Sequence, residues 1–170
     1  MTAFTRTPEN TNLLQPTKFL LTFSRLPATQ YFCQEVNIPG VSLGTVDRVT
    51  PFLDMYSPGT KLTYEPLVIT FTINEDLQSW KDLYDWFTSI ADPDGWQGRD
   101  HPRELQQNKH LSDATLTVLS GLNNPLLRIQ FTNCFPVTLT DIQFDTKQDA
   151  DHIITCTATF RYQSYKYLTA

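Results

Sequence analysis

Residues that commonly carry protein chemistry are sparse in this chain. Its cysteines and histidines number three each: Cys33, Cys134, Cys156, His101, His110 and His152. The cysteines are widely spaced within strand-like runs, with no C-x-x-C pair and no Cys/His spacing typical of zinc. We therefore expect buried, reduced thiols, as in a chain made in a reducing cytoplasm.

Other potential catalytic groups also lack the pattern that their chemistry requires. His101 and Glu104 could be metal ligands, but the surrounding segment predicts a solvated loop, not a rigid site. Asp149 and Asp151 are paired carboxylates, but they lie in an expected turn. General acid–base catalysis requires a pocket, which the sequence does not indicate there. The G-x-S-x-G elbow and the phosphate-binding G-x-x-x-x-G-K-[ST] loop are both absent. The sequence thus predicts no catalytic residue, no cofactor and no metal.

Composition indicates a globular protein of one domain spanning residues 1–170. Hydrophobic residues make up 40% and charged residues 18%, which excludes a disordered chain. No apolar run approaches the ~20 residues of a membrane span. The net charge is −5 without a basic patch, so tight binding to phosphate backbones is not expected.

The hydrophobic pattern predicts strands interrupted by one helix. Lys18–Leu26 and Tyr31–Val36 read as a hairpin with a turn at Pro27-Ala28, and Leu67–Asn74 reads as an alternating strand. A helix is expected over Asp76–Ile90, capped by Asn74 or Asp76. Its apolar stripe is Leu77, Trp80, Leu83, Tyr84, Phe87 and Ile90. Trp86 falls beside this stripe and is a candidate edge or subunit contact. Further strands are expected over 114–119, 126–133, 137–144 and 152–162.

A long hairpin is expected over residues 40–64. Its arms would be Thr45–Thr50 and Lys61–Tyr64, with a tip near Asp54–Gly59, where Ser57-Pro58-Gly59 signals a turn. The segment is too apolar for a solvated loop, so it should bury its surface against a partner subunit. The expected interface residues are Val46, Val49, Phe52, Leu53, Met55, Tyr56, Leu62 and Trp86.

The non-core faces of the predicted strands are rich in threonine. The residues concerned are Thr70, Thr72, Thr138, Thr140, Thr155, Thr157 and Thr159, with a further pair at Thr115 and Thr117. β-Propensity alone accounts for threonine on a solvated strand face. The alternative is a neutral hydroxyl wall that lines a water-filled channel, with few cations to trap a passing polyanion.

The order of elements resembles the tail tube family of contractile-tailed phages and the related tube proteins of type VI secretion. The resemblance rests on Ile38-Pro39-Gly40-Val41 after an early strand, then the long hairpin, a strand, one helix and a strand-rich C-terminal half. It implies a mainly β fold, a β-sandwich or half-barrel of about 6–8 strands with one packed α-helix. It also implies contact segments at the N-terminal arm, residues 1–16, and at the surface loop, residues 92–112.

The same resemblance implies a structural function. Hexameric rings would stack into an inner tail tube that conducts phage DNA into the host, with the threonine faces toward the lumen. The implied partners are the tail sheath, the baseplate and, before ejection, a tape measure protein in the lumen. The protein would belong to the virion tail and be assembled in the host cytoplasm.

Two alternatives stay open at this point. The length of the 92–112 insertion is compatible with a specialised ring, such as the baseplate tube initiator. A monomeric ligand-binding β-sandwich domain would instead use Trp96, Tyr162, Tyr165 and Tyr167 as exposed stacking anchors.

Overall fold

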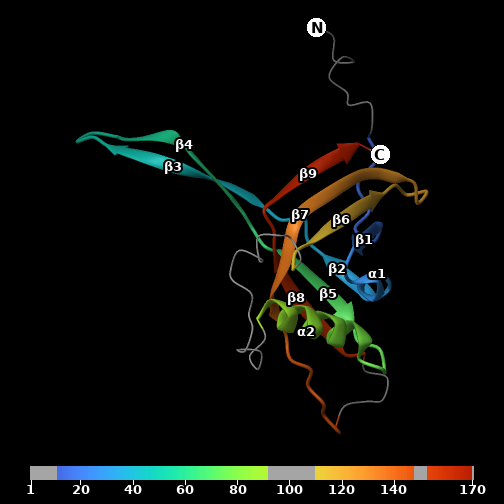
Figure 1. Ribbon diagram of the computed structural model, residues 1–170. Coiled ribbons are helices and arrows are strands. Elements are labelled where there is room, and N and C mark those ends of the chain that lie inside the picture. Colours follow the sequence, from blue (N-terminus) through green and yellow to red (C-terminus); the bar gives the residue numbers. More distant parts are fainter. Residues whose placement is uncertain (1–10, 92–109, 148–152, 170) are drawn as a thin grey trace.

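A computed structural model describes residues 11–91, 110–147 and 153–169, and the structural statements below concern these residues. The fold is mainly β, as predicted (Figure 1). Along the chain the elements are β1 (Phe19–Phe23), α1 (Pro27–Phe32), β2 (Cys33–Val36), β3 (Val41–Val49), β4 (Asp54–Tyr64), β5 (Leu67–Thr72), α2 (Gln78–Ile90), β6 (Ser112–Leu119), β7 (Pro125–Leu139), β8 (Thr155–Arg161) and β9 (Ser164–Thr169).

The long strand β7 joins two halves of one antiparallel sheet. Its first part pairs with β6 on one side and β9 on the other, and β1 lies beyond β6. From Phe135 onward it pairs with β8, which is followed by β5 and then β2. Asn133, at the change of partners, has a left-handed backbone with a φ of 55°. The hairpin of β3 and β4 forms a separate two-stranded sheet.

Strict alternation along the strands builds one hydrophobic core from both halves. Leu67, Ile69 and Phe71 of β5 are buried, while the residues between them are half-buried on the opposite face. The same period-2 pattern in β6 and β8 follows from the pleat of a strand. Phe160 of β8 contacts Phe23 of β1, with 4.9 Å between ring centroids, so the two halves close on each other.

Helix α2 buries a face that overlaps the expected stripe only in part: Leu83 is buried and Trp80 and Ile90 pack against the core, but Trp86 is buried as well. The buried residues of the helix are Ser79, Leu83 and Trp86, spaced for one helical face. Trp86 is only 1% exposed, packs against Phe160 and donates its indole N–H to His110 O at 2.7 Å. The expectation of Trp86 as an edge or subunit contact is therefore wrong. Tyr84, predicted to be core, is 50% exposed.

The start of α2 confirms Asn74 as a capping residue. Its Oδ1 accepts a hydrogen bond from the backbone N–H of Gln78 at 3.0 Å. Leu77, between them, has a left-handed backbone with a φ of 56°, which is unusual for a residue with a side chain. Side-chain capping thus comes from a residue before the helix, since Leu77 itself offers no polar side chain.

The predicted first hairpin does not form. Pro27 begins the short helix α1 instead of a turn, because its fixed φ and missing N–H suit the first turn of a helix. The strand after it, β2, pairs with β5, while β1 pairs with β6. Residues 1–10 of the expected arm and 92–109 of the expected loop lie outside the described residues, as do His101, Glu104, His152, Trp96, Asp149 and Asp151.

Candidate assembly surfaces

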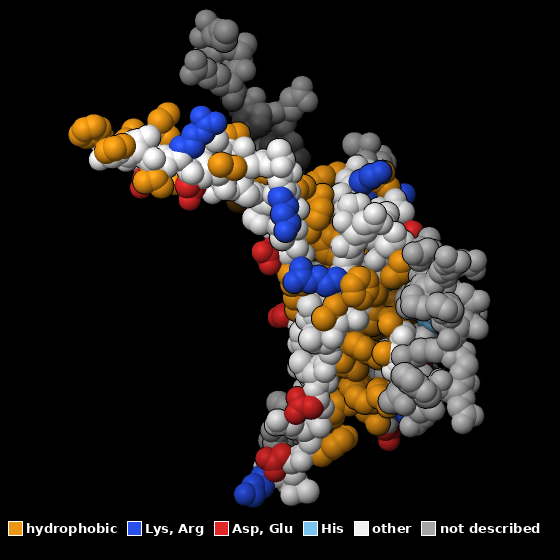
Figure 2. All heavy atoms as spheres, turned by 60° about the vertical axis from the view of Figure 1, so that its left-hand side comes forward, with side chains coloured by type: hydrophobic (Ala, Val, Ile, Leu, Met, Phe, Trp, Pro, Cys, Tyr) orange, Lys and Arg blue, Asp and Glu red, His pale blue; other side chains and the backbone are white. Residues whose placement is uncertain are grey.

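The hairpin of β3 and β4 projects from the body, as Figures 1 and 2 show. Its turn lies at residues 50–53, not at Asp54–Gly59, because Pro58 sits within β4 opposite Thr45. The Thr50 hydroxyl closes the turn by accepting a hydrogen bond from Leu53 N at 3.1 Å and donating one to Leu53 O. The end of the hairpin is therefore a defined structure in the free chain.

Apolar side chains cover the hairpin without any contact that buries them. Phe52 at the turn is 99% exposed. The other expected interface residues on the hairpin are likewise exposed: Val46, Val49, Leu53, Met55, Tyr56 and Leu62. Many exposed apolar side chains on one projecting segment are typical of interaction sites. These residues thus remain the candidate assembly surface.

Pairing register separates the outer hairpin into two chemically different faces. Directly opposed residues share a face in an antiparallel pair. Arg48 opposes Met55, two residues along from Val46. The other face carries the acids, since Asp47 opposes Tyr56 and Val49 opposes Asp54. One face is therefore apolar and cationic, and the other apolar and anionic.

An irregularity in the register bends the hairpin near its middle. The register shifts between Leu43 and Thr45, leaving Gly44 without a partner. A Cβ at Gly59 would lie 2.5 Å from Gly44 O, so only glycine fits there. Such a β-bulge increases local twist and re-aims the strands beyond it.

Aromatic residues hold the base of the hairpin against the body. Tyr64 contacts the rings of Tyr162 and Tyr165, with centroids 5.9 and 5.3 Å apart. The Tyr162 hydroxyl donates to Glu65 O at 2.8 Å, and the Tyr165 hydroxyl to Pro39 O at 3.3 Å. Burial raises the pKa of Tyr162. Two of the aromatics expected as ligand anchors are thus engaged in packing within the chain, although Tyr167 is exposed.

Six of the seven predicted lumen threonines lie on one face of the β7–β8–β5 half-sheet. Thr70 opposes Thr157 and Thr72 opposes Thr155, while Thr138 opposes Thr159. The five on β5 and β8 are on the side away from the core, because the residues between them are buried. Thr138 of β7 shares that face because it opposes Thr159. The Thr140 hydroxyl is used differently, since it accepts a hydrogen bond from Thr157 N at 2.9 Å.

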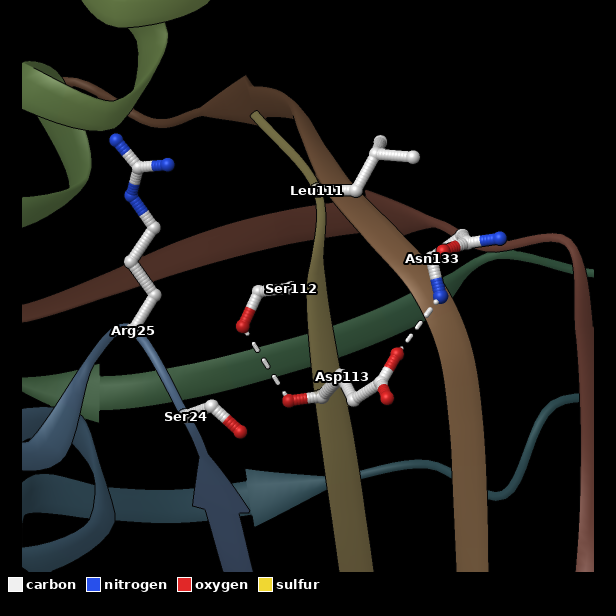
Figure 3. A pocket seen from close by; sticks show the side chains of 6 residues that line it. All are labelled: Ser24, Arg25, Leu111, Ser112, Asp113 and Asn133. Carbon is white, nitrogen blue, oxygen red and sulfur yellow. Dashed lines mark hydrogen bonds between the residues drawn. The ribbon is translucent and has the colours of Figure 1, made fainter. Parts of the chain in front are cut away.

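A polar recess of about 510 Å³ lies beside β6 and β7 (Figure 3). Its polar groups already have partners: Asp113 Oδ1 accepts from Asn133 N at 3.1 Å, and Ser112 Oγ donates to Asp113 O at 3.3 Å. Arg25 donates to Ser89 Oγ and lies over the Trp86 ring. Across the part of the chain that the structure describes, no group of three metal-ligating side chains is found.

The thiols are unsuited to nucleophilic chemistry. Burial raises the pKa of Cys134 to about 12 and that of Cys33 to about 11. Both thiols are therefore protonated near neutral pH, whereas the thiolate is the nucleophile. Cys134 and Cys156 are buried and Cys33 is half-buried, and all three cysteines are free. None of the described helices is long and apolar enough to cross a membrane.

The fold is that of tail tube proteins, and the chain belongs to the phage tail tube protein family, whose model matches residues 22–168. The expected family is thereby confirmed, and the protein is a structural phage tail component, not an enzyme. The tail tube terminator protein of Enterobacteria phage T4 is 24% identical over 162 residues, covering 91% of this chain and 89% of the relative.

Two solved structures share the fold. The tube-terminating cap of the anti-feeding prophage has a TM-score of 0.68 at 15% identity, over 100% of both chains. A chain from the sheath/tube terminator of the PVC extracellular contractile injection system has a TM-score of 0.66 at 14% identity, covering 93% of this chain and 98% of its own.

Proposed function

We propose that this protein forms the terminating ring of the tail tube in a contractile phage tail. The observation that carries the proposal is the 24% identity to the T4 tail tube terminator, which extends over nearly the full length of both chains. Fold similarity to a tube-terminating cap supports it. A repeating tube subunit, the reading first favoured from the sequence, is the second candidate and is supported by the family match.

The free edges of the sheet support the proposal of a closed ring. In the described structure β2 pairs only with β5, and the last part of β7, from Phe135, pairs only with β8. Unpaired edges invite pairing with another chain unless they are covered. We propose that neighbouring copies join these edges, so that β2, β5, β8 and the end of β7 from each copy form a continuous barrel in a hexameric ring.

A terminator is expected to assemble into single rings and not to polymerise further. The purified chain should form discrete rings at rising concentration without growing into tubes. Added to tubes growing from the tube protein of the same phage, labelled chain should appear at one tube end and halt elongation. Electron microscopy with light scattering measures both. Long tubes formed by this chain alone would reject the terminator and favour the repeating subunit.

The proposed lumen is the threonine face of the β7–β8–β5 half-sheet. Thr157 and Thr159 lie on one face of β8, so lysine at both positions would line the channel with cations in every copy. Each phosphate contact strengthens DNA binding and makes it salt-dependent. The Thr157→Lys/Thr159→Lys protein should therefore assemble but slow DNA ejection, most strongly at low salt.

A matched control exists in the other half-sheet. Thr115 and Thr117 have the same spacing and are also half-buried on the non-core face, but they lie on β6. Lysine at these two positions should leave ejection kinetics unchanged. Normal ejection from virions that carry the Thr157→Lys/Thr159→Lys ring would refute the lumen assignment while leaving the ring itself intact.

The proposed ring implies further partners. A terminating ring would contact the last ring of the tube and the end of the sheath, while a baseplate contact would suit an initiator ring. DNA would pass through the lumen without a fixed binding site, after a tape measure protein has left it. Assembly would take place in the host cytoplasm.

A further inference from the structure

A second exposed apolar feature lies at the start of α2. A recess of about 580 Å³ lies between this point and residues 142–144 and 153–154. It is lined by Ile73, Asn74, Glu75, Leu77, Ile142, Phe144, Ile153 and Ile154. Glu75 is the one charged residue among them. Phe144 is 79% exposed, so a free subunit leaves much of this apolar surface to water.

A backbone hydrogen bond joins two sides of the recess. Ile73 N donates to Ile154 O at 3.1 Å, which ties the α2 side to the start of β8. Leu77 N donates to Asn74 O at 2.9 Å. Leu77 also keeps its left-handed backbone, which glycine would adopt without strain. The chain thus places a strained leucine where its side chain lines the recess, and such outliers often mark functional sites.

Ring symmetry requires a receiving surface on every copy. A ring of identical subunits uses a heterologous contact, so each chain presents both a projecting surface and its complement. The hairpin end is the projecting surface. Two other recesses have largely polar linings, one around Ser24 and Asp113 and one that includes Gln30 and Gln34. The recess at α2 has the apolar walls that suit Phe52 and Leu53.

Charge selects the hairpin face that fits. The Val46, Arg48 and Met55 face brings a cation to an apolar surface. The recess is also an apolar surface, and it carries one carboxylate, that of Glu75. The opposite face would instead place Asp47 and Asp54 against Glu75, which is unfavourable because like charges repel.

We propose that the end of the β3–β4 hairpin binds in the α2 recess of a second copy of this chain. Arg48 would then face the carboxylate of Glu75 of the partner subunit. This contact rests on the proposed ring and identifies the surface that receives the hairpin. Because Thr50 closes the turn in the free chain, the hairpin end does not have to be ordered on binding, which favours association.

Charge reversal tests the contact. Arg48→Glu and Glu75→Arg should each raise the protein concentration for half-maximal ring assembly by about tenfold or more at low salt. The double variant Arg48→Glu/Glu75→Arg should restore assembly to nearly that of the unaltered chain, because every copy then carries the pair in reverse. Asp47→Lys, on the opposite face, should leave assembly unchanged. Light scattering over a concentration series measures this.

The outcomes separate the contact from the ring. All these side chains are exposed, so the melting temperature of each variant should match that of the unaltered chain. Single variants that assemble normally, or a double variant as weak as the singles, would overturn the contact while the ring survives. Absence of rings from the unaltered chain would reject the proposed ring, and the contact with it.

Discussion

Replacing residues 44–61 by Asn-Gly should abolish ring formation while the body stays folded. The replacement keeps the opposed pair Leu43 and Leu62 and closes it with a two-residue turn suited to a β-hairpin. No residue of the hairpin belongs to the hydrophobic core cluster of the described structure. The loss should therefore fall on assembly, because the exposed apolar surface between Val46 and Leu53 is removed.

Two measurements decide this prediction. Size-exclusion chromatography with light scattering should show a monomer at concentrations where the unaltered chain forms rings. Thermal melting of the shortened chain should differ little from that of the unaltered monomer. Rings that still form would show that the hairpin is not the joint. A collapsed melting transition would show that the hairpin stabilises the body.

The second large effect concerns Trp86. Trp86→Ala should destabilise the protein by about 3–5 kcal/mol, as expected for an aromatic residue deleted from a core. The substitution also removes the donor to His110 O. In a chain of this length each kcal/mol lowers the melting temperature by roughly 2–4 °C, so a fall of about 10 °C is expected.

Tyr84 is the matched control on the same helix. It stacks on Trp80, with centroids 5.5 Å apart, but is 50% exposed. Tyr84→Ala should therefore cost no more than about 1 kcal/mol. Chemical denaturation of both variants provides the comparison. Equal losses, or a Trp86→Ala variant that melts normally and fails only to assemble, would contradict the assignment of Trp86 to the core.

Local patterns predicted the elements well where one face is buried. Alternation in Leu67–Thr72 and in residues 155–161 predicted both strands and their faces, because a one-residue shift would expose every core side chain. The threonines could be grouped for the same reason. The sequence could not show that these threonines lie on one half-sheet, because that depends on the pairing of strands that are distant along the chain.

The errors have identifiable causes. Pro27 signals a turn and a helix start equally well in sequence, and the structure uses it for a helix. Ser57-Pro58-Gly59 resembles a turn, yet proline is tolerated within a strand of an isolated hairpin, whose outer edges are unpaired. Trp86 was misplaced because two apolar stripes compete around α2, and only the packed sheet decides which one is buried.

Strand β7 has a consequence for how the body comes apart. It supplies backbone hydrogen bonds to β6 and β9 with its first part and to β8 with its last. Opening of either half of the sheet therefore removes backbone hydrogen bonds from β7, the strand on which the other half is also paired. Regions that share a central strand tend to open as one cooperative unit. We therefore expect the body to open as a single unit and the hairpin, which contributes no residue to the core cluster, to open separately from it.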